Sequence, residues 1–429
     1  MKSRKQQAID IVDYYSVNIR PMWQGLKQES AAFWWLCIYV FFEYVRPLYL
    51  FPALAVIPWA QIALLLAIVT TFLDKSVEWV RSPVNSLIIA FFILVFLSSL
   101  FAFSPAASWE RFTTVINWFI IYFLIINVVN SEKRYFIFIL LFLLVSFKLS
   151  QFGFRAFVGR GFSYAGWGVS GPPGWFQNSG EFGIQMVIFT SLSAAFVLAL
   201  KEYWGRYKRV FFYLMPITGF VSVIATSSRG DLLGIIGVGI WFIIKSRKGL
   251  KALIGLLFIG WVLYMVTPPE FKEEFQTAGE DSTSIERLQL WEYGMDIVRK
   301  HPGLGIGYDN WRINCWFENP NGFGIKQRCH EAHNTFVEAV SELGVPAFLI
   351  FILMILFIFI QNSRSRANAK RNNNKFILYL SHGLDGGVVG YVISAFFIST
   401  LFYPFVWFQL AMTVALHEVS KKQAVNNTS

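Results

Sequence analysis

The stretch VPAFLIFILMILFIFIQ, residues 345–361, decides the fold class because nearly all of its side chains are apolar and none is charged. A run of about 20 such residues is long enough to cross a hydrocarbon layer of about 30 Å as a helix. Inside lipid the backbone must satisfy its own hydrogen bonds, and a helix does so within one segment. We therefore predict a transmembrane helix at residues 345–361.

Apolar runs of similar length recur along most of the 429 residues. The chain is 55% hydrophobic, 18% aromatic and only 15% charged, which is less charge than soluble proteins usually carry. We therefore predict an all-α integral membrane protein with about twelve transmembrane helices. The predicted spans are residues 32–50, 54–73, 84–103, 112–129, 134–152, 181–200, 209–226, 230–245, 250–267, 345–361, 377–400 and 403–418.

The basic residues predict how these helices are oriented. The formal net charge is +11, but the Lys and Arg residues lie between the apolar runs and form no RNA-binding motif, which argues against nucleic acid as a partner. Every second connection is basic, as in residues 201–209, 245–251 and 364–375. Because such loops stay in the cytoplasm beside anionic membrane lipids, we predict that both chain ends are cytoplasmic.

Two connections on the predicted outer side are long, residues 153–180 and 268–344. Loops of that length are usually functional or contain secondary structure of their own. We therefore predict that the active site lies in a large, partly helical outer loop between spans nine and ten. The predicted division is a cytoplasmic segment 1–30 without signal-peptide features, spans one to nine in 31–267, the outer catalytic loop 268–344, spans ten to twelve in 345–418 and a cytoplasmic tail 419–429.

The first half of this loop indicates two helices. Residues 270–277 have a short amphipathic pattern suited to a membrane surface. Thr283 and Glu286 have the spacing of a capping box, and Pro302 ends the helix that follows. The apolar residues of that second helix are Ile285, Leu288, Trp291 and Met295.

The next segment, PGLGIGYDNW at residues 302–311, is rich in glycine. It does not resemble a nucleotide-binding loop, because no buried strand precedes it and no Lys-Ser/Thr pair ends it. We interpret it as a tight turn whose glycines adopt conformations that other residues avoid. A further helix is predicted after it, ended by Gly344 and Pro346. Its apolar stripe consists of Phe336, Val337, Val340 and Leu343.

Two of the three cysteines, Cys315 and Cys329, lie in the same predicted outer loop. An outer loop faces an oxidising compartment, so we predict a Cys315–Cys329 disulfide. The alternative is a metal site formed by these cysteines with His330 and His333. The spacing matches no common zinc motif, and we expect no metal site.

Three stretches carry a resemblance to a known family. They are Ser227 to Leu233, Glu286 to Trp291 leading into His301 to Gly307, and His333-Asn334 followed by Gly344; Glu43 to Pro47 and Asn178 to Glu181 add weaker matches. With the predicted helices, they resemble the O-antigen ligase and polymerase superfamily of bacterial inner membranes. The sequence departs from the ligase pattern at Ala347, where Gly, Thr or Tyr is usual.

The resemblance implies transfer of a glycan from undecaprenyl pyrophosphate to an acceptor hydroxyl on the periplasmic face of the inner membrane. The acceptor would belong to lipid A core, another glycolipid or glycan, or a protein. No metal or other cofactor is expected. Arg229 and Arg287 would stabilise the leaving pyrophosphate, because guanidinium groups bind phosphate through paired hydrogen bonds and keep their charge. His333 would accept the acceptor's proton in a direct, inverting displacement.

Further residues are expected to bind the donor or the acceptor: Arg155, Arg160, Tyr308, Asn310, Asn334 and Glu338. Each proposed role has an ordinary structural alternative. Arg229 would also suit contact with lipid headgroups, Arg287 a solvated helix face, and His333 a packed position at a helix start. Glu338 would equally suit a solvated surface.

The same residues fit a polymerase that joins repeat units, or a protein O-oligosaccharyltransferase, about as well as a ligase. A polysaccharide transporter is the alternative from another class. Transporters often show inverted repeats and ionisable residues near the membrane midplane. This chain shows no clear repeat, and its distinctive polar residues lie in the predicted outer loops, so we favour an enzyme.

Overall fold

The structure is a computed structural model, which describes residues 10–47, 51, 53, 56–163, 168–246, 249–250, 254–255, 260, 282–324 and 327–426. Throughout that part of the chain the regular structure is helical, apart from one isolated bridge between Phe323 and Arg328. The predicted all-α class is therefore confirmed.

Among the described residues, seven helices are long and apolar enough to cross a membrane. They are α5 (Pro83–Leu100), α6 (Pro105–Val128), α7 (Glu132–Gly159), α8 (Ser179–Leu200, extended by η3 Lys201–Tyr203), α9 (Arg206–Ala225), α15 (Thr335–Arg371) and α16 (Lys375–Ala395). Two shorter apolar helices precede them, α3 (Ala31–Val45) and α4 (Trp59–Leu73). The predicted count of about twelve spans stays a prediction.

The remaining helices are shorter or more polar. The helices α10 (Arg229–Lys245) and α17 (Pro404–Asn426) occupy two further predicted spans, while α1 (Ile11–Tyr15), α2 (Ile19–Leu26), α13 (Ser282–Lys300) and α14 (Trp311–Glu318) lie outside all of them. The predicted ninth span, 250–267, falls almost wholly outside the described residues, as does the predicted helix at 270–277.

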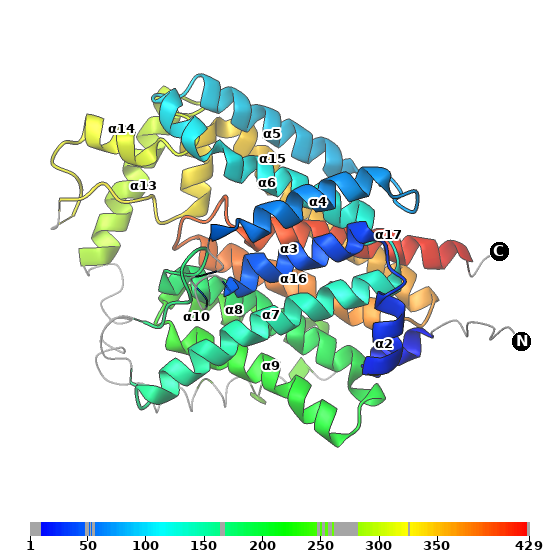
Figure 1. Cartoon of the computed structure of the whole chain (residues 1–429). Coiled ribbons are helices and arrows are strands. Elements are labelled where there is room, and N and C mark those ends of the chain that lie inside the picture. The colour runs from blue at the N-terminus through cyan, green and yellow to red at the C-terminus, as the bar shows by residue number, and fades with distance from the viewer. Residues whose placement is uncertain are drawn as a thin grey trace, which may run out of the picture.

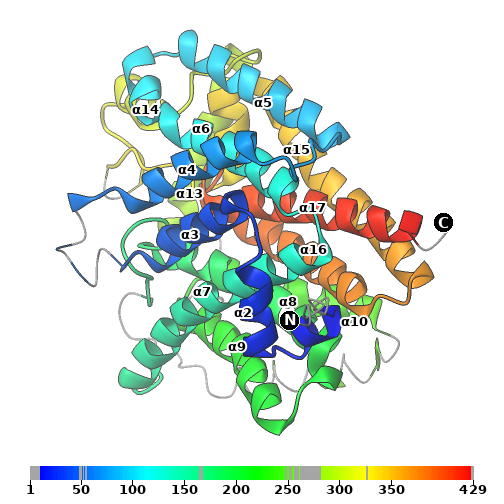
Figure 2. The same cartoon turned by 45° about the vertical axis from the view of Figure 1, so that its right-hand side comes forward.

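The helices pack side by side around α8, which is the most deeply buried of the long helices (Figure 1). Its neighbours are α16, α9, α10 and α7, and α17 and α15 continue the bundle on the other side of α16. The helices α13 and α14 lie together at one end of the bundle, whereas α2 and the last turns of α17 lie at the other (Figures 1 and 2).

Polar contacts at the α2 end join several connections of the chain. The Glu132 carboxylate, at the start of α7, accepts hydrogen bonds from the Tyr15 hydroxyl at 2.5 Å, the Asn374 side-chain amide at 2.5 Å and the Gln423 side-chain amide at 2.6 Å. Segments far apart in sequence therefore meet at this end. They are segments for which the charge pattern predicts a cytoplasmic location.

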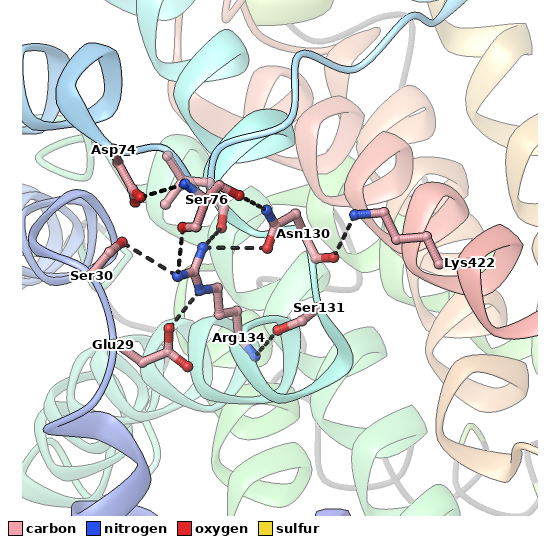
Figure 3. Close-up of polar contacts among 9 residues, drawn as sticks. Glu29, Ser30, Asp74, Ser76, Asn130, Ser131, Arg134 and Lys422 are labelled. Carbon is pink, nitrogen blue, oxygen red and sulfur yellow. Dashed lines mark hydrogen bonds and ion pairs between the residues drawn. The ribbon is translucent and has the colours of Figure 1, made fainter. Parts of the chain in front are cut away.

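Arg134 forms a second junction at the same end (Figure 3). Its guanidinium group donates to Glu29 at 2.6 Å, to the Ser30 hydroxyl at 3.3 Å and to Asn130 at 3.3 Å. The residue is only 7% exposed, and a buried guanidinium group needs a carboxylate and further acceptors because it keeps its charge. Arg134 thus connects the start of α7 to the segment before α3.

The glycine-rich turn at the opposite end packs against a kink in α15. Gly305, Gly307 and Gly344 have φ angles of 66°, 106° and 78°, which side chains disfavour. The Gly307 amide donates to the Glu342 carbonyl at 2.9 Å, and the Val345 amide donates to the Pro302 carbonyl at 2.9 Å. The interpretation of 302–311 as a tight turn is confirmed, and the predicted helix end at Gly344 is a kink after which α15 continues.

The turn is also fixed to the helices beside it. The Ser98 hydroxyl of α5 donates to the Leu304 carbonyl at 2.7 Å, and the Ser108 hydroxyl of α6 donates to the Tyr308 carbonyl at 2.6 Å. Asn310 lies beside them, and its side-chain amide donates to the Ser108 oxygen at 2.8 Å. The turn therefore joins α5, α6 and α15 into one unit.

Of the four apolar residues noted in the sequence of α13, Trp291 is half-buried and its indole N–H donates to the Ala332 carbonyl at 3.0 Å. Ile285, Leu288 and Met295 are 45%, 55% and 43% exposed. The buried side chains are Leu290, Tyr293 and Ile297, which pack with Trp311, Cys315 and Cys329 in a small separate core. These three residues follow the same helical period on a neighbouring face, and the packing of α14 selects that face.

We predict that Gly344→Ala destabilises the protein. A Cβ atom there would lie 2.3 Å from the Gly303 carbonyl oxygen, and φ is 78°. A residue with a Cβ atom in this backbone region costs on the order of 1–3 kcal/mol, so the thermal midpoint in detergent should fall by several degrees. Gly303→Ala is the matched control, because its Cβ would meet nothing within 4 Å. Equal midpoints for the two variants would contradict the packing of turn against kink.

Candidate functional site

His333 lies at the entrance to α15, directly before the residue that caps the helix. Its φ angle of 48° is in the left-handed region, which few residues other than glycine adopt. Asn334 caps the helix by accepting hydrogen bonds from the Phe336 amide at 2.9 Å and the Val337 amide at 3.2 Å. The His333 and His330 rings are 6.0 Å apart between centroids. The cap and the left-handed residue together set the direction of the His333 side chain.

The surroundings of His333 keep its imidazole neutral. Burial lowers its pKa to about 4, and the positive charges of Arg287, His330 and Arg312 act in the same direction. A neutral imidazole has a nitrogen that can accept a proton. The contribution of Arg287, a residue of α13, places its guanidinium charge within electrostatic reach of His333.

Arg229 lies at the same end of the bundle as His333, and the loop 396–400 lies between the two helix starts. It is the first residue of α10, and the Ser394 hydroxyl donates to the carbonyl of the next residue, Gly230, at 3.3 Å. On the other side of this loop, the Thr335 hydroxyl donates to the Ile398 carbonyl at 2.7 Å. The starts of α10 and α15 therefore flank one short loop, which places Arg229 and His333 at the same end of the bundle.

Next to His333 lies a polar cavity of about 330 Å³. It is bounded by the start of α6, the turn at 308–313, the first turns of α15 and the segment 399–403. Its lining residues are Ala107, Glu110, Arg111, Thr114, Trp175, Tyr308, Asp309, Trp311, Arg312, Ile313, Glu331, Ala332, Glu338, Glu342, Ser399, Phe402 and Tyr403.

Glu342 fixes the wall of this cavity. Its carboxylate, 3% exposed, accepts hydrogen bonds from the Asp309 amide at 3.0 Å and the Trp311 amide at 2.9 Å. Burial raises the pKa of Asp309, and the Arg111 guanidinium group, 3.3 Å from its carboxylate, opposes that rise. Because each carboxylate oxygen of Glu342 accepts one of these hydrogen bonds, the residue holds the turn at 309–311 in place.

A larger cavity of about 690 Å³ adjoins the polar one. The two share Thr114 and Trp175 as lining residues. The larger cavity lies between α3, α4 and α6, and its walls include Phe42 and Leu64. A polar space and a mainly apolar space therefore meet at Trp175.

Some of the predicted site residues line the polar cavity and others do not. Tyr308 and Glu338 line the polar cavity. Asn310 and Asn334 are 0% and 3% exposed, and their side chains hold the turn and the helix start. Arg155 and Arg160, which are exposed near the end of α7, line neither cavity.

Arg229, Arg287 and His333 are not among the residues that line the polar cavity, although Ala332, the residue before His333, is. Cys315 and Cys329 are paired as a disulfide that joins α14 to the segment before His330. Among the described residues, no group of three or more His, Cys, Asp or Glu side chains is arranged to hold a metal ion.

Two residues of the cavity, Ser399 and Tyr403, were not singled out from the sequence. They fall at the ends of the predicted spans 377–400 and 403–418, where nothing in the composition marks them as site residues. Glu181 supports them, because its carboxylate accepts a hydrogen bond from the Tyr403 hydroxyl at 2.6 Å and completes a capping box with Asn178. The Asn178–Glu181 match was a sequence signal pointing to this side of the site.

Comparison with known proteins supports the resemblance seen in the sequence. Residues 214–352 match the model of the O-antigen ligase family, a region that includes Arg229, Arg287 and His333. The chain is also 25% identical over 237 residues to the exopolysaccharide production protein ExoQ of Rhizobium meliloti (strain 1021). That alignment covers 54% of this chain and 48%, about half, of the relative.

Proposed function

We propose, on the premise that residues 214–352 belong to the O-antigen ligase family, that this membrane protein transfers a glycan from undecaprenyl pyrophosphate to an acceptor hydroxyl. The reaction would take place at the bundle end that holds α13 and α14, on the periplasmic side of the inner membrane. The observation that carries the proposal is the half-buried His333, whose pKa is lowered to about 4 by desolvation and by the nearby guanidinium charge of Arg287.

In the proposed step the acceptor oxygen attacks the anomeric carbon of the donor sugar while His333 takes the hydroxyl proton. The bond between that carbon and the pyrophosphate oxygen breaks, and the configuration inverts. The lipid pyrophosphate leaves with the electron pair. Arg287 and Arg229 stabilise its negative charge, because fixed cations at a leaving group lower the barrier without reorganisation.

The acceptor side of the site is assigned to the polar cavity. Glu338 is half-buried there, and its carboxylate is 3.5 Å from the Leu401 amide, so it retains capacity to accept hydrogen bonds from a hydroxyl. The tyrosine ring of Tyr308 forms part of the same wall. Both residues are proposed to bind the acceptor.

A polymerase, which joins one lipid-linked glycan to another, is the second candidate. The relative's printed role in exopolysaccharide production favours it. Loss of the protein would shorten the polymer if the protein is a polymerase. It would leave an uncapped acceptor beside full-length polymer if the protein is a ligase.

We predict that His333→Asn lowers transfer at least about 100-fold, because general-base catalysis typically contributes about 10²–10⁴ in rate. Asparagine tolerates the left-handed backbone but is no base at this pH. The measurement is transfer in proteoliposomes from lipid-linked glycan to isolated acceptor. His330→Asn is the matched control, and near-normal transfer by His333→Asn would remove the base assignment.

We predict that Arg287→Lys also transfers poorly, by about tenfold or more, since an ammonium group cannot make the paired hydrogen bonds of guanidinium. Arg299→Lys, on the same helix but exposed and paired with Asp296, should transfer normally. The same assay compares the two variants. If both retain full activity, Arg287 does not bind the pyrophosphate.

The pH dependence gives a separate prediction. A His333 pKa of about 4, below the ordinary value of 6.5, keeps the base neutral down to that pH. The pH dependence of kcat/KM reports the ionisation of the free enzyme. Its acid limb, the fall in kcat/KM as the pH is lowered, should therefore be centred well below pH 6.5. An acid limb that is centred at or above 6.5 and disappears in His333→Asn would show that burial does not hold the imidazole neutral.

A further inference from the structure

The helix α2, at the end of the bundle opposite α13 and α14, has apolar side chains on two sides. Met22 and Leu26 are partly buried and pack against the main core, and Gly25 between them is buried. Ile19 and Trp23, four residues apart and therefore on one side of the helix, are 82% and 50% exposed. Since the inner pair already joins α2 to the bundle, the outer pair is available for a further contact.

The segment that leads into α2 is fixed to the bundle. Tyr15 is 7% exposed, and its carbonyl accepts a hydrogen bond from the Trp204 indole at 2.8 Å. The Lys208 ammonium group, on α9, donates to the Ser16 carbonyl at 2.8 Å and to the Val17 carbonyl at 3.1 Å. The exposed side of α2 is therefore a defined part of the surface.

The position of α2 matches the level at which the bundle enters the membrane. The first apolar helix, α3, begins at Ala31, shortly after α2 ends at Leu26. The Trp23 ring packs against the Trp34 ring in the first turn of α3, with 6.0 Å between centroids. Figures 1 and 2 show α2 running across the end of the bundle, whereas the long helices run along it. Short amphipathic helices and tryptophan side chains in such positions are typical of the membrane–water interface.

Basic residues flank the exposed apolar pair. Arg20 and Lys27 are exposed, and the Lys27 ammonium group is 5.3 Å from the centre of the Trp23 ring. The helix itself contains no carboxylate, and Glu29, just after it, is paired with Arg134 at 2.6 Å. Cations beside apolar side chains match a lipid surface, where phosphate groups lie beside acyl chains. Without a neighbouring carboxylate, they favour a lipid of net negative charge over a zwitterionic one.

We propose that α2 binds anionic phospholipid in the membrane leaflet at its end of the bundle. Ile19 and Trp23 insert where the acyl chains meet the headgroups, and Arg20 and Lys27 bind the lipid phosphates. The charge pattern of the sequence predicts that this leaflet is the cytoplasmic one. The lipid site lies at the opposite end of the bundle from His333, so it does not depend on the proposed function.

Photolabelling of the full chain in nanodiscs tests the proposal. The probes are phosphatidylglycerol with a diazirine in one acyl chain and phosphatidylcholine with the same modified chain. Mass spectrometry should find phosphatidylglycerol on α2 at least about fivefold more often than phosphatidylcholine, because each basic residue near a membrane surface contributes about that factor in affinity for anionic lipid. Arg20→Gln and Lys27→Gln should each lower the ratio, and the double variant should bring it close to one.

Two further substitutions provide matched controls. Lys370→Gln removes one exposed positive charge near the end of α15, so it changes the net charge equally and should keep the wild-type ratio. Ile19→Ser should weaken labelling of α2 by both lipids, because it removes an inserted apolar side chain. Gln24→Ser, at another exposed position of α2, should leave the labelling unchanged.

Equal labelling of α2 by the two lipids would overturn the proposal, as would a sample in which α5 is labelled and α2 is not. An unchanged ratio in the double Arg20→Gln, Lys27→Gln variant would overturn it as well. The thermal midpoints of these variants in detergent should equal that of the wild type, because the replaced side chains are exposed. A lost preference at an unchanged midpoint therefore reports lost lipid binding.

Glycan transfer measured on the same samples tests the proposed function separately. Wild-type protein that transfers glycan without a lipid preference at α2 would remove the lipid site alone. Protein that shows the preference without transferring glycan would leave the lipid site standing and remove the enzymatic assignment.

Discussion

The packing of the glycine-rich turn against the kink at Gly344 is the contact on which the rest of the site depends. Gly305 and Gly344 allow two backbones to approach so closely that no Cβ atom would fit between them. The Glu342 carboxylate then accepts hydrogen bonds from both the Asp309 and Trp311 amides. This one unit positions the wall of the polar cavity and the first turns of α15, where His333 enters the helix.

The start of α15 has arginine residues on one side and the polar cavity on the other. Arg287 lies close enough to His333 to lower its pKa, and Arg229 begins a helix on the far side of the loop 396–400. The polar cavity, on the other side, is lined by Tyr308, Glu338 and Ser399 among other polar residues. In the proposed reaction the anionic donor lies at the arginines and the hydroxyl-bearing acceptor in the cavity, with His333 between them.

Much of the fold could be predicted because hydropathy and glycine placement are local signals. The apolar runs predicted the long helices, and the glycines of 302–311 predicted a tight turn, as the positive φ angles confirm. The face of α13 could not be predicted, since two adjacent stripes have the same period. The cavity residues Trp175 and Ser399 depend on contacts between distant segments, and Asn310 and Asn334 show that a polar residue in a motif can serve the backbone instead.

The central claim is that the end of the bundle holding α13 and α14 faces outward from the inner membrane. Labelling with a membrane-impermeant maleimide on spheroplasts tests it, in a Cys37→Ser background that retains the disulfide. Asn321→Cys lies beyond α14, and Lys370→Cys near the far end of α15; both positions are exposed. We expect Asn321→Cys to be labelled in intact spheroplasts and Lys370→Cys only after lysis; the reverse pattern would place α13 and α14 in the cytoplasm.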